Sequence, residues 1–209
     1  AWLRAQKALN DRPHLPPRKK LVPRTEIQLG GFGGQGIMSA GRIIGRAAAL
    51  YDKLESCFTQ SYGPEARGGA AGSQVVISSD LIHHPHIIAP ESMIIMSQGA
   101  YNKYLSRLAV EGILLIDDEL VSLPDDHRTD ITTYGIPATR IAEEAGNNRA
   151  ANTAMLGFWT AIVGVISPNA MRQSVLDSVP PKTVELNANV FDTGYQRGMA
   201  ILEKGEAHA

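Results

Sequence analysis

From residue 25 onward, short apolar runs alternate with longer segments whose apolar residues recur at helical spacing. The short runs, bounded by glycine, proline and polar residues, predict strands over 26–29, 54–60, 72–78, 92–97, 112–117 and 131–136. The helical spacing predicts helices over 36–50, 98–108, 137–145, 151–164, 168–177 and 187–204. This alternation predicts an α/β, Rossmann-like, doubly wound fold, in which helices cover both faces of a mostly parallel sheet.

The helix expected over 151–164 is the most apolar of these segments. One helical stripe on it is formed by Ala151, Met155, Phe158 and Ile162. Apolar residues at this spacing mark a buried face. Met155, Phe158 and the neighbouring Trp159 are therefore expected in the core or in an interface.

The charge of the chain is unevenly distributed. The 209 residues carry a net charge of -1, yet residues 1–24 hold seven Lys or Arg against one acidic residue. Four prolines in this segment disfavour helix. We therefore expect a basic, Pro-containing N-terminal arm over 1–24 and one domain over 25–209. The arm is open to three interpretations: a loosely ordered tail, a contact with an acidic partner subunit, or a nucleic-acid contact, which the acidic remainder of the chain disfavours.

Several classes of protein are disfavoured by composition. The longest nearly apolar stretch, 154–166, is shorter than the roughly 20 residues that a membrane span needs, and no secretory signal is recognisable. We expect a cytoplasmic protein with no membrane contact. The single cysteine, Cys57, is expected to be half-buried in a strand. An iron–sulfur cluster or a structural zinc site uses about four ligands, so this chain alone is not expected to build either in the usual way. His83, His84 and His86 favour a surface turn over a metal site, so no metal is expected.

A glycine-rich loop joins the first expected strand to the first expected helix. Gly31, Gly33 and Gly36 match G-x-G-x-x-G, a pattern that lets a phosphate approach the free N–H groups of a helix. A full dinucleotide site also needs an acidic residue after the second strand, but that strand ends in Gln60, Ser61 and Tyr62. Three interpretations stay open: a phosphate of a nucleotide-bearing ligand, a glycine turn that only packs or contacts a subunit, or bound NAD or FAD.

A second loop follows the second expected strand, in QSYGPEARGGAAGSQVVIS, residues 60–78. Arg67 lies between glycines and offers a planar cation to a phosphate or carboxylate, with Glu65 as its orienting partner. The alternative is an Arg–Glu pair that only stiffens a surface turn. Arg149, before the helix over 151–164, is a further candidate for a phosphate contact. One of its asparagine neighbours, Asn148 or Asn152, is expected to cap that helix.

Four stretches together resemble a known family: GFGGQGIMSAGRIIGRAA, QSYGPEARGGAAGSQVVIS, APESMIIMSQGAYNKY and GILLIDDELV. In this order and spacing they resemble the gamma subunit, or gamma domain, of the 2-oxoacid:ferredoxin oxidoreductases, in particular the 2-oxoglutarate (KorC-like) branch. The resemblance covers roughly residues 25–205.

The resemblance implies a subunit of an enzyme that converts a 2-oxoacid, favouring 2-oxoglutarate, and coenzyme A (CoA) into acyl-CoA and CO₂. It implies alpha and beta subunits as partners, and also a ferredoxin-like subunit in some complexes. Thiamine diphosphate, Mg²⁺ and [4Fe-4S] clusters are expected in these partners, and ferredoxin or another acceptor takes the electrons. This chain itself is expected to hold no cofactor and no catalytic residue. Asp117 and Asp118 follow a strand without the flanking glycines of a thiamine-binding pattern.

For this chain the resemblance implies roles in CoA binding and subunit assembly. The CoA or phosphate-binding candidates are Gly31, Gly33, Gly34, Gln35, Gly36, Arg67 and Arg149. The candidates for an interface or active-site loop are Tyr62, Gly63, Pro64, Glu65, Gly68 and Gly69. Two alternatives remain: a free-standing nucleotide-binding protein or NAD(P)-dependent reductase, and a purely structural interface subunit.

Overall fold

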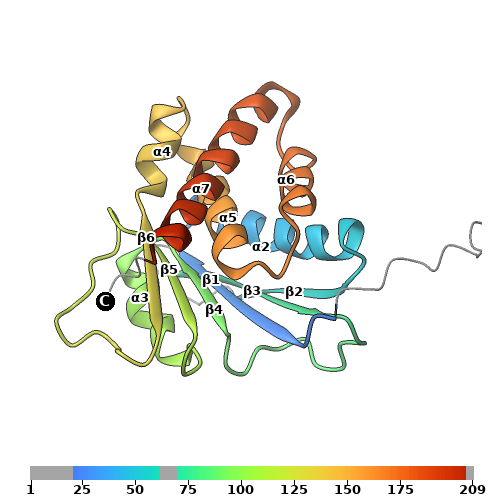
Figure 1. The fold of residues 1–209 in the computed structure, drawn as a ribbon, viewed down its shortest axis with the longest axis vertical. Helices are drawn as coiled ribbons and strands as arrows, with labels where there is room; N and C mark the ends of the chain where they lie inside the picture. The colour runs from blue at the N-terminus through green and yellow to red at the C-terminus, as the bar shows by residue number, and fades with distance from the viewer. Residues whose placement is uncertain (1–20, 62–69, 206–209) are drawn as a thin grey trace, which may run out of the picture.

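The computed structural model describes residues 21–61 and 70–205, in which a central sheet lies between layers of helices (Figure 1). The strands are β1 (Thr25–Gly31), β2 (Glu55–Ser61), β3 (Ala71–Ser78), β4 (Ser92–Ile95), β5 (Ile113–Asp117) and β6 (Thr132–Ile136). Each coincides with an expected strand, apart from small differences at the ends.

The helices also follow the predicted pattern. They are α2 (Ile37–Arg46), α3 (Gln98–Tyr104), α4 (Ala138–Glu144), α5 (Ala151–Val163), α6 (Pro168–Leu176) and α7 (Val184–Lys204). Short turns extend or precede them: η1 (Ala47–Tyr51), η2 (Leu105–Arg107), η3 (Asn148–Ala150) and η4 (Pro181–Thr183). The hydroxyls of Ser97 and Ser167 accept hydrogen bonds from Ala100 N and Ala170 N, so they cap α3 and α6.

The strand order across the sheet is β2-β3-β1-β4-β5-β6. The pairs β1–β4, β4–β5 and β5–β6 are parallel, whereas β3 runs antiparallel to both β1 and β2. The expectation of a mostly parallel α/β sheet is confirmed. The antiparallel β3 between β1 and β2 was not predicted, because the hydrophobic pattern of a strand does not encode its direction.

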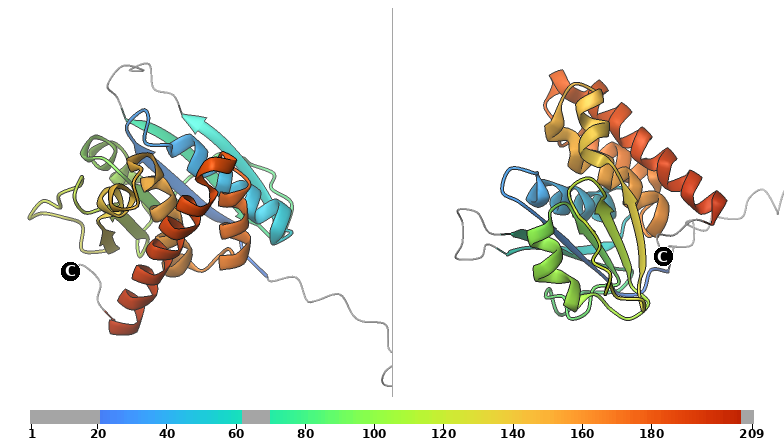
Figure 2. Two further views of the ribbon diagram at one scale, coloured as in Figure 1. Left: turned by 90° about the horizontal axis from the view of Figure 1, so that it is seen from above. Right: turned by 90° about the vertical axis from the view of Figure 1, so that its left-hand side faces the viewer.

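Helices cover both faces of the sheet, as expected. On one face Ile27, Ile94 and Leu115 pack in a core with residues of α2, α4, α5, α6 and α7. On the other face Met93 and Leu114 pack with residues of α3 in a second core. Figure 2 shows this arrangement from the side, with α3 on one side of the sheet and the larger helical layer on the other.

Helix α5 is the central helix of the larger layer. Phe158 and Trp159 are fully buried, and Trp159 Nε1 donates to Ser92 Oγ over 3.0 Å, which confirms the expected core role of this helix. The helix crosses α7 at Gly157 and Gly194, where a Cβ atom on either glycine would collide with the backbone of the other helix. This close packing fixes α5, and its N-terminal end lies at the candidate site described below.

Two further observations concern composition. Cys57 is half-buried in β2, as expected. Within residues 21–61 and 70–205, the structure contains no helix with the length and apolar character needed to cross a membrane.

Candidate functional site

The glycine loop connects β1 to α2 and has one packed end and one open end. Gly36 begins α2 with φ 74°, and a Cβ atom there would collide with the side-chain amide of Asn152. At Gly33 and Gly34, by contrast, a Cβ atom would meet no described atom within 4 Å. The loop therefore presents exposed backbone beside the N-terminus of a helix, which is the arrangement that favours an anion.

Gln35 holds the loop in place. Its Oε1 accepts a hydrogen bond from Phe32 N over 2.6 Å, and its Nε2 donates to Met96 O over 2.7 Å. The side chain thus connects the loop to the residue that follows β4. Gly31 is buried at the end of β1 and contributes to neither of the cavities described below. Gln35 therefore supports the loop structurally.

Arg149 lies opposite the loop, in the η3 turn before α5. The turn is capped by Asn147, whose Oδ1 accepts from Arg149 N over 3.1 Å, so the cap is neither of the asparagines that the sequence suggested. The Arg149 side chain is exposed, and its guanidinium makes no hydrogen bond or ion pair with the residues that the structure describes. A cation at this position with no partner among the described residues is available to a ligand or to another subunit.

Two cavities share Gly34 and Arg149. The first, of about 380 Å³, extends along α5 toward the residues before α7, and the second, of about 350 Å³, is lined also by Gln35 and Thr139. Among the described residues that line them, none is an Asp or Glu. One cation, open backbone amides and an absence of acidic lining together favour an anionic ligand.

A buried carboxylate lies close to the second cavity. Asp117 is fully buried at the end of β5, and its Oδ2 accepts from Thr139 N over 2.9 Å and from Thr139 Oγ1 over 2.6 Å. Burial raises the pKa of Asp117, and the hydrogen bonds from Thr139 oppose that shift. These bonds satisfy donors in the first turn of α4, so Asp117 fixes that helix on the sheet.

The loop after β2 begins at the same edge of the sheet as the glycine loop. Gly31 pairs with Ala71, and Ser61 pairs with Gly72, so β1 and β2 end side by side across β3. The candidates Tyr62, Gly63, Pro64, Glu65, Arg67, Gly68 and Gly69 lie outside the described residues, and their roles stay predictions.

The position of β3 also bears on the dinucleotide interpretation. In a dinucleotide-binding fold the acidic residue follows the strand next to β1. Here β3 separates β1 from β2. Together with the absence of acidic residues from the described cavity lining, this order favours a phosphate of some other ligand over a fully bound NAD or FAD.

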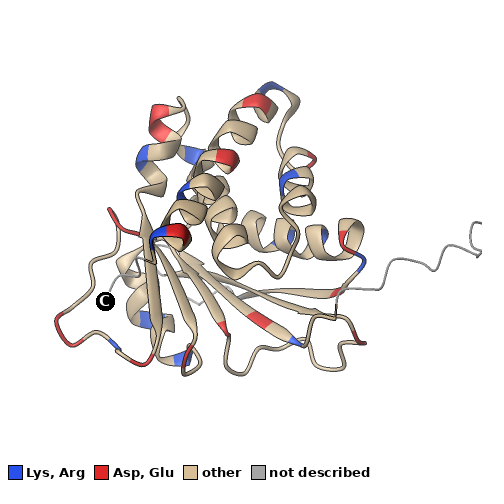
Figure 3. Ribbon diagram, in the orientation of Figure 1, with Lys and Arg blue, Asp and Glu red and all other residues tan. Residues whose placement is uncertain are grey.

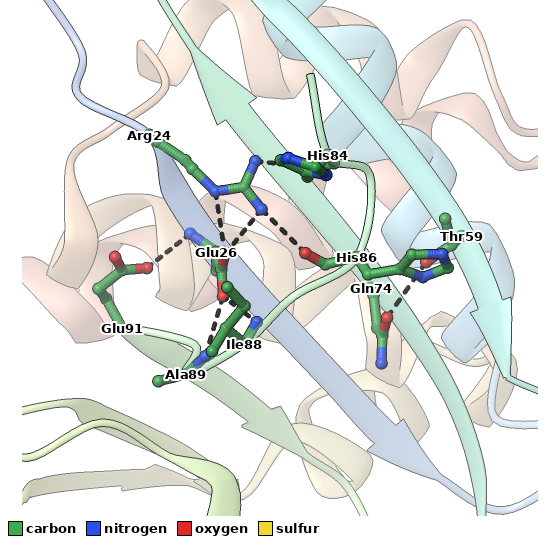
Figure 4. A network of polar contacts seen from close by, with 9 residues as sticks. All are labelled: Arg24, Glu26, Thr59, Gln74, His84, His86, Ile88, Ala89 and Glu91. Atoms are coloured by element: carbon green, nitrogen blue, oxygen red, sulfur yellow. Dashed lines mark hydrogen bonds and ion pairs between the residues drawn. The ribbon is translucent and has the colours of Figure 1, made fainter. Parts of the chain in front are cut away.

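The opposite end of β1 holds a closed polar network (Figure 4). Arg24 donates to Glu26 Oε1 over 3.0 and 2.7 Å and to the carbonyl oxygens of His84 and His86 over 2.8 and 2.9 Å. Glu26 Oε2 accepts from the backbone N–H groups of Ile88 and Ala89. The histidine segment is thus anchored through its backbone. No group of His, Cys, Asp or Glu arranged for a metal was found in the described part of the chain.

Charge on the larger helical layer is mixed. Figure 3 shows Lys and Arg interspersed with Asp and Glu over these helices. Among the described residues that line the two cavities, Arg149 is the one Lys or Arg, so their attraction for an anion comes from Arg149 and the local backbone.

The family model described as "Pyruvate ferredoxin/flavodoxin oxidoreductase" matches residues 26–197. The chain belongs to this family. It is 48% identical to 2-oxoglutarate synthase subunit KorC of Methanocaldococcus jannaschii over 180 residues, which are 86% of this chain and 96% of that protein. The expected resemblance to the gamma subunits of the 2-oxoacid:ferredoxin oxidoreductases is thus confirmed, and the chain is an oxidoreductase subunit of this type.

Solved structures agree with this placement. The gamma subunit of keto/oxoacid ferredoxin oxidoreductase from Geobacter sulfurreducens PCA superposes with a TM-score of 0.76 at 37% identity, covering 85% of this chain and 99% of that one. The 2-oxoglutarate:ferredoxin oxidoreductase from Magnetococcus marinus, solved with 2-oxoglutarate, coenzyme A and succinyl-CoA, has a TM-score of 0.77 at 24% identity. That likeness covers 86% of this chain and 32% of the other and is one of fold.

Proposed function

We propose that this family member binds the phosphate end of CoA within a 2-oxoacid:ferredoxin oxidoreductase complex. The proposal rests on the convergence of open loop backbone and Arg149 on shared cavities. Among the described residues, Arg149 has no partner and none of the lining residues is acidic. The phosphates of CoA are anions that can accept hydrogen bonds from an arginine and from backbone N–H groups. The Magnetococcus marinus relative in fold is an oxidoreductase solved with CoA, which supports CoA over other phosphorylated ligands.

The complex would oxidise a 2-oxoacid, for which 2-oxoglutarate is the first candidate because relatives at 42–48% identity are 2-oxoglutarate synthase subunits. Thiamine diphosphate, Mg²⁺ and [4Fe-4S] clusters would be held by the alpha and beta subunits or a ferredoxin-like subunit, and ferredoxin or another acceptor would take the electrons. The single cysteine of this chain agrees with that division, since a [4Fe-4S] cluster uses about four cysteine ligands.

The contribution of this chain is to bind and orient. The loop amides and Arg149 would hold phosphate oxygens, while Gln35 keeps the loop in place. A contact with another subunit beside the site is supported by Phe32, a large apolar side chain at the loop tip that is 46% exposed. The same loop would then serve both CoA binding and assembly.

The test is the steady-state kinetics of the assembled complex with an Arg149→Ala subunit. Losing a charge-assisted contact should raise the apparent KM for CoA by about tenfold or more. The effect on kcat should be smaller, because a phosphate far from the reacting thiol is bound alike before and during reaction.

The matched control is Arg107→Ala, an exposed arginine of the η2 turn beside α3, on the other face of the sheet. It removes the same charge from the same type of short turn, and its KM for CoA should equal that of the unmodified complex. An unchanged KM in an assembled Arg149→Ala complex would contradict the proposed role.

A further inference from the structure

Asn152 lies in the first turn of α5, at the joint between this helix and the glycine loop. Only 8% of the residue is exposed, and its Nδ2 donates to Gly36 O over 3.2 Å. That carbonyl also accepts the first hydrogen bond of α2, from Ala40 N. Because the amide nitrogen is committed to a carbonyl, the orientation of the side chain is fixed, and Oδ1 is the free end.

Oδ1 of Asn152 accepts no hydrogen bond from the described residues. In the described part of the chain, every fully covered side-chain oxygen or nitrogen has a hydrogen-bond partner. Oδ1 of Asn152 has none, so it is not fully covered and solvent still reaches it. Asn152 lines the cavity of about 380 Å³, and that cavity supplies the access. A nearly buried residue thus presents an acceptor to the cavity and leaves it unused.

The other buried polar groups of this cavity are used internally. Thr153 Oγ1 donates to Asn187 Oδ1 over 2.9 Å, and Asn187 Nδ2 donates to Thr183 O over 2.9 Å. Asn152 differs from these two residues because its acceptor has no partner among the described residues. The phosphate-facing groups, Arg149 and the loop amides, are donors, whereas Asn152 Oδ1 can only accept.

A phosphate bound beside Gly36 would not satisfy Asn152, because a phosphate dianion offers acceptors. We propose that Asn152 Oδ1 accepts a hydrogen bond from a hydroxyl on the carbon next to the phosphate-bearing carbon of the ligand. This inference rests on the proposed function, and in CoA that group is the 2′-hydroxyl of the ribose 3′-phosphate. Asn152 is then a specificity residue that distinguishes a ribose phosphate from its deoxy counterpart.

The size and lining of the cavity agree with a nucleotide. Its volume of about 380 Å³ lies within the range of small-molecule sites, about 300 to 1,000 Å³. Beyond Asn152 its lining is mostly uncharged, with hydroxyl and amide side chains that suit a sugar and a base.

The experiment uses two probes, adenosine 3′,5′-bisphosphate and its 2′-deoxy analogue, as inhibitors competing with CoA in the assembled complex. The unmodified complex should bind the ribose probe about fivefold more tightly, the worth of one hydrogen bond. Asn152→Leu should reduce this ratio to about one. The control Asn189→Leu, at an exposed position of α7, should keep the ratio of the unmodified complex.

Equal inhibition of the unmodified complex by both probes would overturn the inference, and this comparison needs no variant. A ratio that persists in Asn152→Leu would also overturn it. The proposed CoA site is tested separately by Arg149→Ala: if that variant weakens both probes while the unmodified complex does not discriminate, the CoA site stands and the role of Asn152 fails. If neither probe competes with CoA and Arg149→Ala has no effect, both proposals fail.

Discussion

Two arginines at opposite ends of β1 differ in what surrounds them. At the start of the strand, Arg24 has its guanidinium hydrogen-bonded to a buried carboxylate and to two backbone carbonyls. At the end of the strand, beyond the glycine loop, Arg149 has no such partner among the described residues and lies between two cavities. The Arg24 guanidinium is used in contacts within the fold, whereas the Arg149 guanidinium is available to a ligand.

This difference between the two ends of β1 agrees with a general property of α/β proteins, whose ligands bind at the carboxyl ends of parallel strands. The start of β1 has its polar groups paired and would stabilise the fold. Near the end of β1, the loop backbone is exposed, and the Arg149 guanidinium and Asn152 Oδ1 have no hydrogen-bond partner among the described residues. Substitutions of the paired polar groups at the start should therefore change stability, and substitutions of the unpaired polar groups at the end should change binding.

The largest effect on stability is expected for Glu26→Ala. Glu26 is 5% exposed, and its carboxylate accepts from Arg24, Ile88 and Ala89. Its removal leaves two backbone donors without a partner and leaves the guanidinium with only its two backbone carbonyl acceptors. The free energy of unfolding should fall by about 3 kcal/mol, measured by urea unfolding of the purified chain.

The control for this variant is Glu55→Ala, which removes an exposed acidic residue at the start of β2. It should change the free energy of unfolding by less than about 0.5 kcal/mol. A similar loss in both variants, or a change in KM for CoA in an assembled Glu26→Ala complex, would break the contrast between the two ends of β1.

A smaller effect on stability, at the other end of the strand, is expected for Gly36→Ala. The positive φ of 74° and the collision with Asn152 should cost about 2 kcal/mol in unfolding free energy. Gly33→Ala, in the same loop but with open space around it, is the matched variant and should cost less than about 0.5 kcal/mol. If both variants unfold alike, the packed and open halves of the loop are not distinct.

The smallest effect concerns the pH dependence of Asp117. Its pKa is raised in the folded protein by burial, so the folded state holds its proton more tightly than the unfolded state. This contribution to stability is fully present below the unfolded pKa of about 4 and is lost as pH rises through the folded pKa.

Urea unfolding of Asp117→Asn across this pH range tests the sign, because other carboxylates contribute equally to both proteins. The unfolding free energy of the unmodified chain, relative to the variant, should decrease as pH rises above about 4. A relative increase would show that hydrogen bonds from Thr139 outweigh burial and that the folded pKa is lowered.

The elements of the fold could be predicted from sequence because hydrophobic periodicity is local. The strands and helices of residues 21–61 and 70–205, and the core role of Phe158 and Trp159, follow from residues a few positions apart. The glycine loop could be found as well, since the strand before it and the helix after it are also local.

Contacts between distant segments could not be predicted in this way. The insertion of β3 between β1 and β2 depends on strand pairing across the sheet. The bonds from Asn152 to Gly36 and from Thr139 to Asp117 join residues far apart in sequence. The sequence places Asn152 at a helix start, where caps and anion contacts both occur, but nothing local indicates that its amide lies against the glycine loop.

The structure of the assembled complex with bound CoA would show whether the cavities beside Arg149 hold the phosphates of CoA. We expect a CoA phosphate within about 3.2 Å of the Arg149 guanidinium and of backbone N–H groups of the glycine loop. CoA bound with its phosphates away from both groups, in a fully assembled complex, would contradict the proposed phosphate site.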